Sequence, residues 1–97
     1  MRNNDYGYLL NWRPLAKQDL NSIIQFIAKD NKERARSFGQ TLYAKTLALK
    51  SHPLMGRVGR IPGMRELIVH KNYVVYYRLD KNIIEILRIR HTAENWP

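Results

Sequence analysis

The residues that decide the fold are 65–97, RELIVHKNYVVYYRLDKNIIEILRIRHTAENWP. Three runs within this stretch are rich in the β-branched and aromatic side chains that favour strands, and two short connections of hairpin length separate them. The runs are residues 65–69, 73–79 and 83–90, and the connections are residues 70–72 and 80–82. The stretch therefore predicts three consecutive antiparallel strands followed by a basic tail that carries a histidine.

The alternation of side chains in the last two runs predicts which face of the sheet the helices cover. If Arg78 pairs with Ile84, one face is the more apolar and suits helix packing, with Glu85 as its only charge. That face carries Tyr73, Val75, Tyr77, Leu79, Ile83, Leu87 and Ile89, and the opposite face carries Val74, Tyr76, Arg78, Ile84, Ile86, Arg88 and Arg90. This pairing leaves three arginines near Tyr76 on the open face, whereas a slip of one residue would reverse the two faces.

The residues before the sheet predict an edge strand and a helical hairpin. Residues 8–12 are short, apolar and aromatic, which suits an edge strand. Apolar residues recur at helical spacing over residues 14–29, and a second helical pattern continues to about Lys50. Asp30 with Glu33 forms the aspartate version of a capping box, which predicts the start of the second helix there.

Residues 51–63, SHPLMGRVGRIPG, form the one long segment without a regular pattern. Glycine allows a backbone to approach a phosphate closely, and Arg57 and Arg60 add positive charge. The segment is either a basic loop that contacts an anion or an ordinary connection from the helices to the sheet.

The composition indicates one folded domain, residues 1–97, with a strong excess of positive charge. The 97 residues include 17 Lys and Arg against 8 Asp and Glu, a formal charge of +9. Such an excess suggests an acidic partner, namely nucleic acid, an anionic membrane face or an acidic protein, although a generally basic surface is also possible. The absence of cysteine, of a long apolar run and of a leader pattern leads us to expect a cytoplasmic protein without membrane contact.

The end of the last predicted strand carries the residues best suited to chemistry. Arg88 and Arg90 can hold a phosphate, and His91 can move a proton near neutral pH, with Trp96 five residues further on. Cleavage of RNA needs a second acid or base, and the sequence does not offer an evident one. The alternative is that His91 merely ends a strand and Trp96 covers the edge of the core. The three histidines are scattered, so we expect no metal and no cofactor.

At these residues the sequence resembles the RelE/ParE superfamily of toxins from bacterial type II toxin–antitoxin systems. The similarity extends over about residues 10–97 and is most specific in HP-x-x-GR, RELIVH-x-NYVVYYR and a terminal H-x-x-x-x-WP. The resemblance implies an α+β fold in which an N-terminal strand and a helical hairpin pack on a twisted antiparallel sheet, in the order β-α-α-β-β-β. It also implies an acidic antitoxin, encoded alongside, that wraps and neutralises the toxin.

Two activities occur in this superfamily, and the resemblance to the ParE-like group is the closer one. RelE-like members cleave mRNA on the ribosome, and ParE-like members act on DNA gyrase. Arg65 matches a basic position of RelE-like toxins, and His91 matches the catalytic histidine of one of their branches. Other catalytic positions of RelE-like toxins differ in this chain. Val74 stands in place of a catalytic arginine, Thr92 in place of a tyrosine, and Ala93 in place of a late arginine. Glu94 stands where a ParE-like tail commonly has a basic residue.

The expected function is therefore that of a gyrase-binding toxin, with a ribosome-dependent endoribonuclease as the alternative. His91 is the candidate catalytic residue for the nuclease alone. The candidate contacts with the target or with nucleic acid are Arg60, Arg65, Arg78, Arg88, Arg90 and Trp96.

Overall fold

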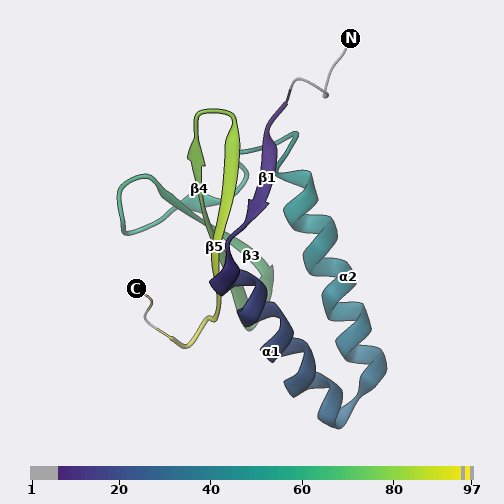
Figure 1. The fold of residues 1–97 in the computed structure, drawn as a ribbon. Coiled ribbons are helices and arrows are strands. Elements are labelled where there is room, and N and C mark those ends of the chain that lie inside the picture. Colours follow the sequence, from purple (N-terminus) through teal and green to yellow (C-terminus); the bar gives the residue numbers. More distant parts are fainter. Residues whose placement is uncertain (1–6, 95, 97) are drawn as a thin grey trace.

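The computed structural model describes residues 7–94 and Trp96, and in it a helical hairpin lies against one face of a five-stranded sheet (Figure 1). The elements in chain order are β1 (Leu9–Trp12), α1 (Pro14–Asp30), α2 (Lys32–Ala48), β2 (Arg57–Val58), β3 (Met64–His70), β4 (Tyr73–Asp80) and β5 (Ile83–His91). This arrangement confirms the predicted α+β fold. Neither helix has the length and apolar character that crossing a bilayer requires.

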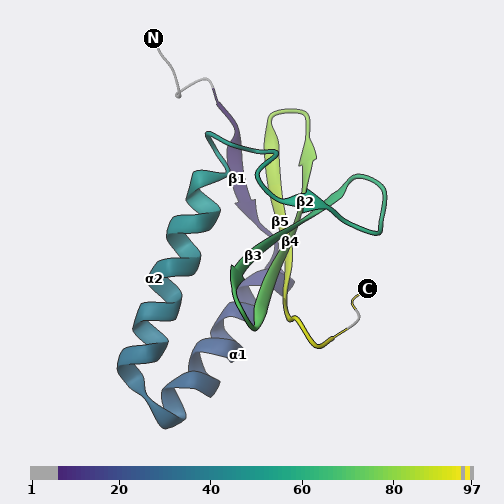
Figure 2. The same cartoon turned by 180° about the vertical axis from the view of Figure 1, so that it is seen from behind.

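The order of the strands across the sheet is β1-β5-β4-β3-β2 (Figures 1 and 2). β1 lies at one edge, as predicted, and pairs with β5 in parallel, so the sheet is mixed rather than wholly antiparallel. The helical hairpin carries the chain from β1 to the far side of the sheet, the kind of long connection that allows parallel pairing. At the other edge, the two-residue strand β2 lies inside the segment predicted as irregular and pairs with Arg65 and Glu66.

The predicted register of the last hairpin is wrong by one residue over its first half. Arg78 pairs with Glu85 rather than with Ile84, so Ile84 and Ile86 lie in the core. The predicted register would have placed the carboxylate of Glu85 among apolar side chains, which costs free energy. Instead, Glu85 accepts a hydrogen bond of 3.1 Å from Arg13.

A β-bulge then restores the predicted faces for the second half of β5. Tyr77 pairs with Ile86 but Tyr76 pairs with Arg88, which leaves Leu87 as an extra residue in β5. The bulge returns Ile89 to the core and places Arg90 opposite Val74. The strand therefore buries Ile84, Ile86 and Ile89 on one side in spite of their uneven spacing.

The break between the helices is shorter than predicted. Asn31 alone separates α1 from α2, and its side chain caps α2 by accepting the backbone N–H of Arg34 at 3.0 Å. The predicted capping box of Asp30 and Glu33 is therefore wrong by one residue, because Asp30 still belongs to α1.

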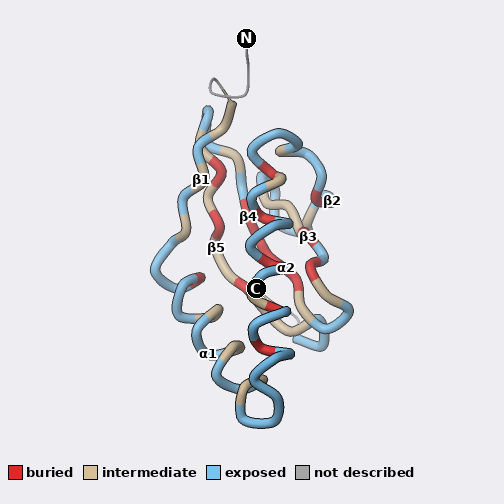
Figure 3. The backbone as a smooth tube through the Cα atoms, turned by 90° about the vertical axis from the view of Figure 1, so that its right-hand side faces the viewer, coloured by how far each residue is buried: buried red, intermediate tan, exposed pale blue. Residues whose placement is uncertain are grey.

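The core lies between the helical hairpin and the central strands. Figure 3 shows buried residues along β4 and β5, while most of the outer helical surface is exposed. The helices contribute Ala16, Phe38, Leu42 and Leu49, and the strands contribute Leu67, Val69, Val75, Tyr77, Ile84, Ile86 and Ile89. Within the part of the chain that the structure describes, no helix lies against the opposite face of the sheet, which we call the open face.

Candidate functional site

The C-terminal tail folds back over the open face. Its Trp96 lies against Tyr76, with 4.6 Å between the ring centroids. Tyr76 is only 7% exposed although no helix covers it. The tail leaves the end of β5 on the side away from the helices (Figures 1 and 2). Trp96, one of the predicted contact residues, thus belongs to the open face.

Charged side chains surround the hydroxyl of Tyr76. Burial, followed by the nearby carboxylate of Glu66, raises the pKa of Tyr76, whereas Arg60 and Arg57 act in the opposite direction. Arg57 also donates to Glu66 across a 2.9 Å ion pair. Glu66 pairs with Tyr76 across β3 and β4, so the Arg57–Glu66 ion pair lies on the strand next to the phenol.

Two of the predicted contact arginines are available on the surface. Arg60 lies on the loop after β2, and Arg78 lies on β4 opposite Glu85 and Met64. Both are exposed, and neither forms any of the ion pairs found among the described residues. They are suited to bind an acidic group on another molecule.

Arg88 is engaged by α1. Its Nε and one terminal nitrogen donate to the two carboxylate oxygens of Asp19 at 2.8 and 3.0 Å, and the backbone N–H of Ile89 donates to Asp19 at 2.9 Å. The bonds from Arg88 to Asp19 raise the pKa of Arg88, which favours its charged form. The guanidinium therefore joins α1 to β5 and has both carboxylate oxygens as partners.

Arg65 holds the loop before β2. Its guanidinium donates to the carbonyl oxygens of Gly56 at 2.7 Å and Leu54 at 3.4 Å. Beside it, the hydroxyl of Tyr77 accepts the N–H of Gly56 at 2.9 Å and donates to the carbonyl of Pro53 at 2.7 Å. These bonds explain the HP-x-x-GR pattern, in which the backbone of the loop is fixed to the sheet.

At the end of β5, the side chains of Arg90 and His91 contact different partners. The carboxylate of Glu94 accepts from the Arg90 guanidinium and, at 2.9 Å, from the backbone N–H of His91. The bond from His91, followed by those from Arg90, lowers the pKa of Glu94. The imidazole of His91 instead packs against Tyr73, with 5.3 Å between the rings. It lies on the helix side, away from the open face.

His91, Arg88 and Arg65 therefore do not come together at one place. His91 lies on one side of the sheet, Arg88 is paired with a helix, and Arg65 is bonded to a loop. No three potential metal-ligating side chains come together within residues 7–94 and Trp96. The open face, with Arg60, Arg78 and the Tyr76–Trp96 pair, has the character of a binding surface.

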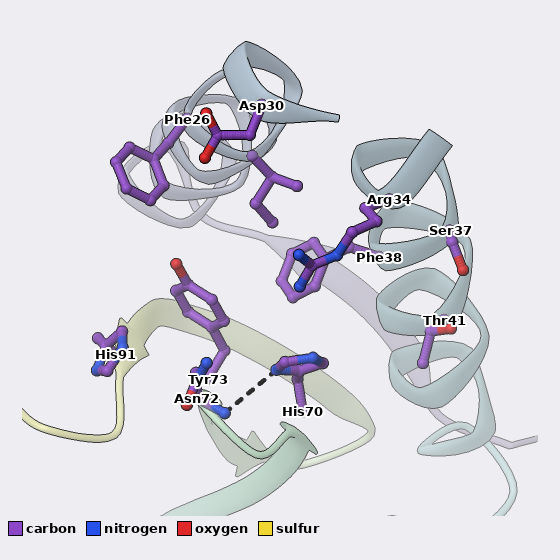
Figure 4. Close-up of a pocket in the computed structure, with 11 residues that line it drawn as sticks. Phe26, Asp30, Arg34, Ser37, Phe38, Thr41, His70, Asn72, Tyr73 and His91 are labelled. Atoms are coloured by element: carbon purple, nitrogen blue, oxygen red, sulfur yellow. Dashed lines mark hydrogen bonds between the residues drawn. The ribbon is translucent and has the colours of Figure 1, made fainter. Parts of the chain in front are cut away.

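The sequence analysis did not anticipate a groove on the helix side. The groove has a volume of about 450 Å³ and runs between the two helices and the ends of β3, β4 and β5 (Figure 4). It is lined by Phe26, Ile27, Asp30, Arg34, Ser37, Phe38, Thr41, His70, Asn72, Tyr73 and His91. Only the pairing of the strands indicates this groove: His70 on β3 and His91 on β5 both pair with Tyr73 on β4, so the three rings lie at the same end of the sheet.

Comparison with known proteins assigns the family. Residues 10–96 match the family model described as the ParE toxin of the type II toxin–antitoxin system parDE. The candidate toxin Y4kP of Sinorhizobium fredii is 32% identical over 89 residues, which are 91% of this chain and 92% of that protein. Toxin RelE2 of Caulobacter vibrioides is 33% identical over 82 residues, 84% of this chain and 90% of its own.

A solved structure agrees with the sequence relatives. A chain of the chromosomal ParDE toxin–antitoxin system from Pseudomonas aeruginosa is similar over 87% of this chain and 95% of its own, with a TM-score of 0.75 and 25% identity. The family model, the sequence relatives and the similar structure therefore all indicate the same family. The chain belongs to the ParE toxin family of type II toxin–antitoxin systems.

Proposed function

We propose that this toxin stops growth by binding DNA gyrase through its open face and that a cognate antitoxin keeps it inactive. The observation that carries the proposal is that the residues which the nuclease alternative would use to contact or cleave RNA make other contacts in this fold. Arg88 is bonded to Asp19, Arg65 to the carbonyls of a loop, and His91 packs on the helix side. With these three side chains committed to other contacts, we expect the open face to be better suited to binding than to cleavage.

The open face offers two kinds of contact for a large protein target. Arg60 and Arg78 provide exposed guanidinium groups, which form strong bidentate bonds with carboxylates. Trp96 provides a large, half-buried aromatic surface beside them, and tryptophan and arginine are the residues most enriched at the centres of interfaces. A target with an acidic, partly apolar patch fits this surface.

One observation supports the nuclease as a second candidate. Glu66, Tyr76, Arg57 and Arg60 lie together on the open face, so a carboxylate, a phenol and two cations are close to one another. A scissile phosphate could reach Tyr76 only after Trp96 moves away. If the protein is a nuclease, the phenol of Tyr76, which its raised pKa keeps protonated, would serve as the general acid.

The test is to express the chain without its antitoxin and to compare DNA synthesis with translation in the first minutes. The gyrase proposal expects early arrest of replication with induced DNA damage, and inhibition of purified gyrase in a supercoiling assay. Early loss of translation with cleaved mRNA would overturn it in favour of the nuclease.

Substitutions on the open face sharpen this test. Arg60→Glu with Arg78→Glu should weaken inhibition of gyrase at least tenfold, and Lys45→Glu on the exposed side of α2 is the matched control. His91→Ala should leave toxicity intact. Loss of toxicity in His91→Ala, with an unchanged circular dichroism spectrum, would instead indicate that His91 takes part in the chemistry.

A further inference from the structure

We infer that the cellular target binds the β2 hairpin, residues 54–66, in an apolar cleft edged with carboxylates. This inference rests on the proposed function, because it concerns how the target protein is held at the open face and around its border. The hairpin lies beside the open face, and its loop projects from the sheet away from α2 (Figures 1 and 2).

Large apolar side chains are concentrated on the surface of the β2 hairpin. Ten of the described residues are large, hydrophobic and exposed, and four of these lie within residues 54–61. The four are Leu54, Met55, Val58 and Ile61, and Val58, at 72% exposure, is the most exposed of all ten. Single apolar residues on a surface need no explanation, whereas a group of them marks a site of interaction with another molecule.

A tight turn fixes the tip of the hairpin. The backbone N–H of Met64 donates to the carbonyl of Ile61 at 3.0 Å. Pro62 and Gly63 lie between them, and the φ angle of Gly63 is +84°. These are the features of a type II turn, in which proline occupies the second position and glycine the third. The N–H of Gly59 also donates to the carbonyl of Met64 at 2.9 Å, which closes the loop.

The base of the hairpin is fixed as well. The guanidinium of Arg65 donates to the carbonyls of Leu54 and Gly56. One residue further along β3, Glu66 accepts a hydrogen bond of 2.9 Å from Arg57. These contacts order the backbone of the hairpin while its apolar side chains stay exposed. Order without burial suits a recognition element, because a segment that is ordered in advance loses less entropy when it binds.

The two sides of the hairpin differ in chemistry. Arg57 pairs with Glu66 and Val58 with Arg65, so the side chains of Arg57 and Val58 point to opposite faces of the sheet. Arg57 shares the open face with Tyr76, which is the partner of Glu66 on β4. A target that contacts both the guanidinium group and the apolar side chain must therefore surround the hairpin, which a cleft does and a flat surface does not.

The charge of the hairpin indicates an acidic partner. Arg60 is exposed near the tip and lies outside the ion pairs found among the described residues, and the side chain of Arg57 is 67% exposed within its pair. The formal charge of +9 adds long-range attraction for carboxylates and repels a second copy of this chain.

The aliphatic side chains indicate that this partner is a protein. Nucleic acids are bound mainly through phosphate contacts and through stacking of bases on aromatic rings, and valine and isoleucine provide neither. An apolar centre with arginine beside it is instead the usual composition of a protein interface. The target cleft should therefore be apolar inside and carry carboxylates at its edge.

The experiment combines inhibition of purified gyrase with toxicity in cells that lack the antitoxin. Val58→Ala with Ile61→Ala removes apolar groups from the hairpin, and Leu15→Ala with Tyr43→Ala removes exposed apolar groups from the helices as the matched control. We expect the hairpin variant to inhibit gyrase at least tenfold more weakly and to lose toxicity at equal expression. The control should stay within threefold of the unmodified toxin in both assays.

Two further variants test the fold and the rigidity of the hairpin. Val58→Thr keeps the shape and the strand preference of valine but makes its surface polar, so it should weaken inhibition severalfold without affecting the circular dichroism spectrum. Gly63→Ala keeps every exposed side chain but strains the turn, since alanine disfavours a φ angle of +84°. It should also weaken inhibition severalfold, and unchanged inhibition in both variants would contradict the inference.

The two assays separate the inference from the proposed target. If the unmodified toxin does not inhibit gyrase, the proposed target is wrong, and loss of toxicity in the hairpin variant alone still supports the hairpin as the contact with the target. A folded hairpin variant that remains as toxic as the unmodified chain overturns the inference, and so does an equal loss in the helix control. Unchanged toxicity together with lost binding to anionic lipid vesicles, or with lost self-association, would assign the hairpin to a membrane or to a second copy instead.

Discussion

At the scale of single residues, Asp19 links the first helix to the last strand. β1 ends at Trp12, so the part of β5 beyond Ile86 has no strand on that side. Asp19 takes the place of a neighbouring strand there, since it accepts both the backbone N–H of Ile89 and the guanidinium of Arg88. The side chains of Asp19 and Arg88 are 13% and 21% exposed, so water competes weakly for these bonds.

Asp19→Ala should therefore destabilise the fold by about 2–3 kcal/mol, because it leaves a largely buried guanidinium and a backbone N–H without partners. Urea unfolding followed by circular dichroism measures the change. Asp80→Ala, which removes an exposed carboxylate at the end of β4, should stay within about 0.5 kcal/mol. If the two substitutions lowered the free energy of unfolding equally, the cause would be the change in net charge and not the loss of the link between α1 and β5.

At the scale of elements, the loop before β2 is fixed by its close approach to β4. A Cβ atom on Gly56 would lie 2.6 Å from the ring of Tyr77 and 2.9 Å from the backbone oxygen of Glu66. Only glycine allows the loop to come close enough for the Tyr77 hydroxyl to bond with it on both sides. The loop, which carries Arg57 towards the open face, is in this way as well defined as the sheet.

Gly56→Ala should cost about 2–3 kcal/mol of stability, since neither the ring of Tyr77 nor the strand backbone can move aside without loss of packing. Amide hydrogen exchange should also increase in the residues around the loop. Gly39→Ala, within α2, is the control: its Cβ would meet only Ile24 at 3.4 Å, and alanine favours a helix over glycine by about 1 kcal/mol. A loss in Gly39→Ala as large as that in Gly56→Ala would contradict this account.

The elements themselves could be predicted from local patterns, whereas their exact pairing could not. Helical spacing of apolar residues and β-branched runs identified both helices and the three long strands. The bulge at Leu87 could not be predicted, because strict alternation of side chains cannot reveal an extra residue in a strand. The bulge allows Ile84, Ile86 and Ile89 all to lie in the core while Glu85 stays out of it. The cap lies at Asn31 rather than at Asp30. Both residue types can cap a helix, but α1 continues through Asp30, so the side chain of Asn31 is the one that accepts the N–H of Arg34.

The candidate site was harder to predict than the fold. Arg88 and His91 have suitable chemistry, but their partners Asp19 and Tyr73 lie on other elements, and no local pattern connects them. The groove depends on three separate regions of the chain meeting, so its residues carry no common signal in the sequence. Arg78 was identified as a possible contact from its predicted place on the open face, and Arg60 from its charge in a glycine-containing loop. Both side chains are exposed in the structure, which is consistent with that hypothesis.

At the scale of the whole molecule, the sheet separates two surfaces, and the tail connects them. The groove lies on the helix side and the Tyr76–Trp96 pair on the open face, while Glu94 holds the turn between them. Because the pKa of Glu94 is lowered in the fold, its carboxylate form is favoured there. Its stabilising effect is complete above the ordinary value of 4.5 and is lost as the pH falls through the lowered pKa.

The tail should therefore leave Tyr76 at acid pH, below about 4.5. Trp96 fluorescence in a Trp12→Phe background would follow this change as a shift to longer wavelength. Glu94→Gln should abolish the pH dependence and leave the tail loose at neutral pH. Glu85 also has a lowered pKa, mainly through its bond from Arg13, so Glu85→Gln is the matched control and should keep the acid transition. A transition that persists in Glu94→Gln would exclude Glu94 as its cause.

Among the described residues β1 pairs with β5 alone, so the earliest strand in the chain has no partner until the latest one is present. During translation β1 and both helices emerge from the ribosome well before β5, so the five-stranded sheet cannot close until residues 83–91 have emerged as well. A truncated or stalled chain therefore lacks the strand that holds β1, the Asp19 link and the root of the tail. The parallel pairing of β1 therefore adds no stability to the nascent chain until β5 is present, and a chain that stops short of β5 should unfold more readily than one that carries it.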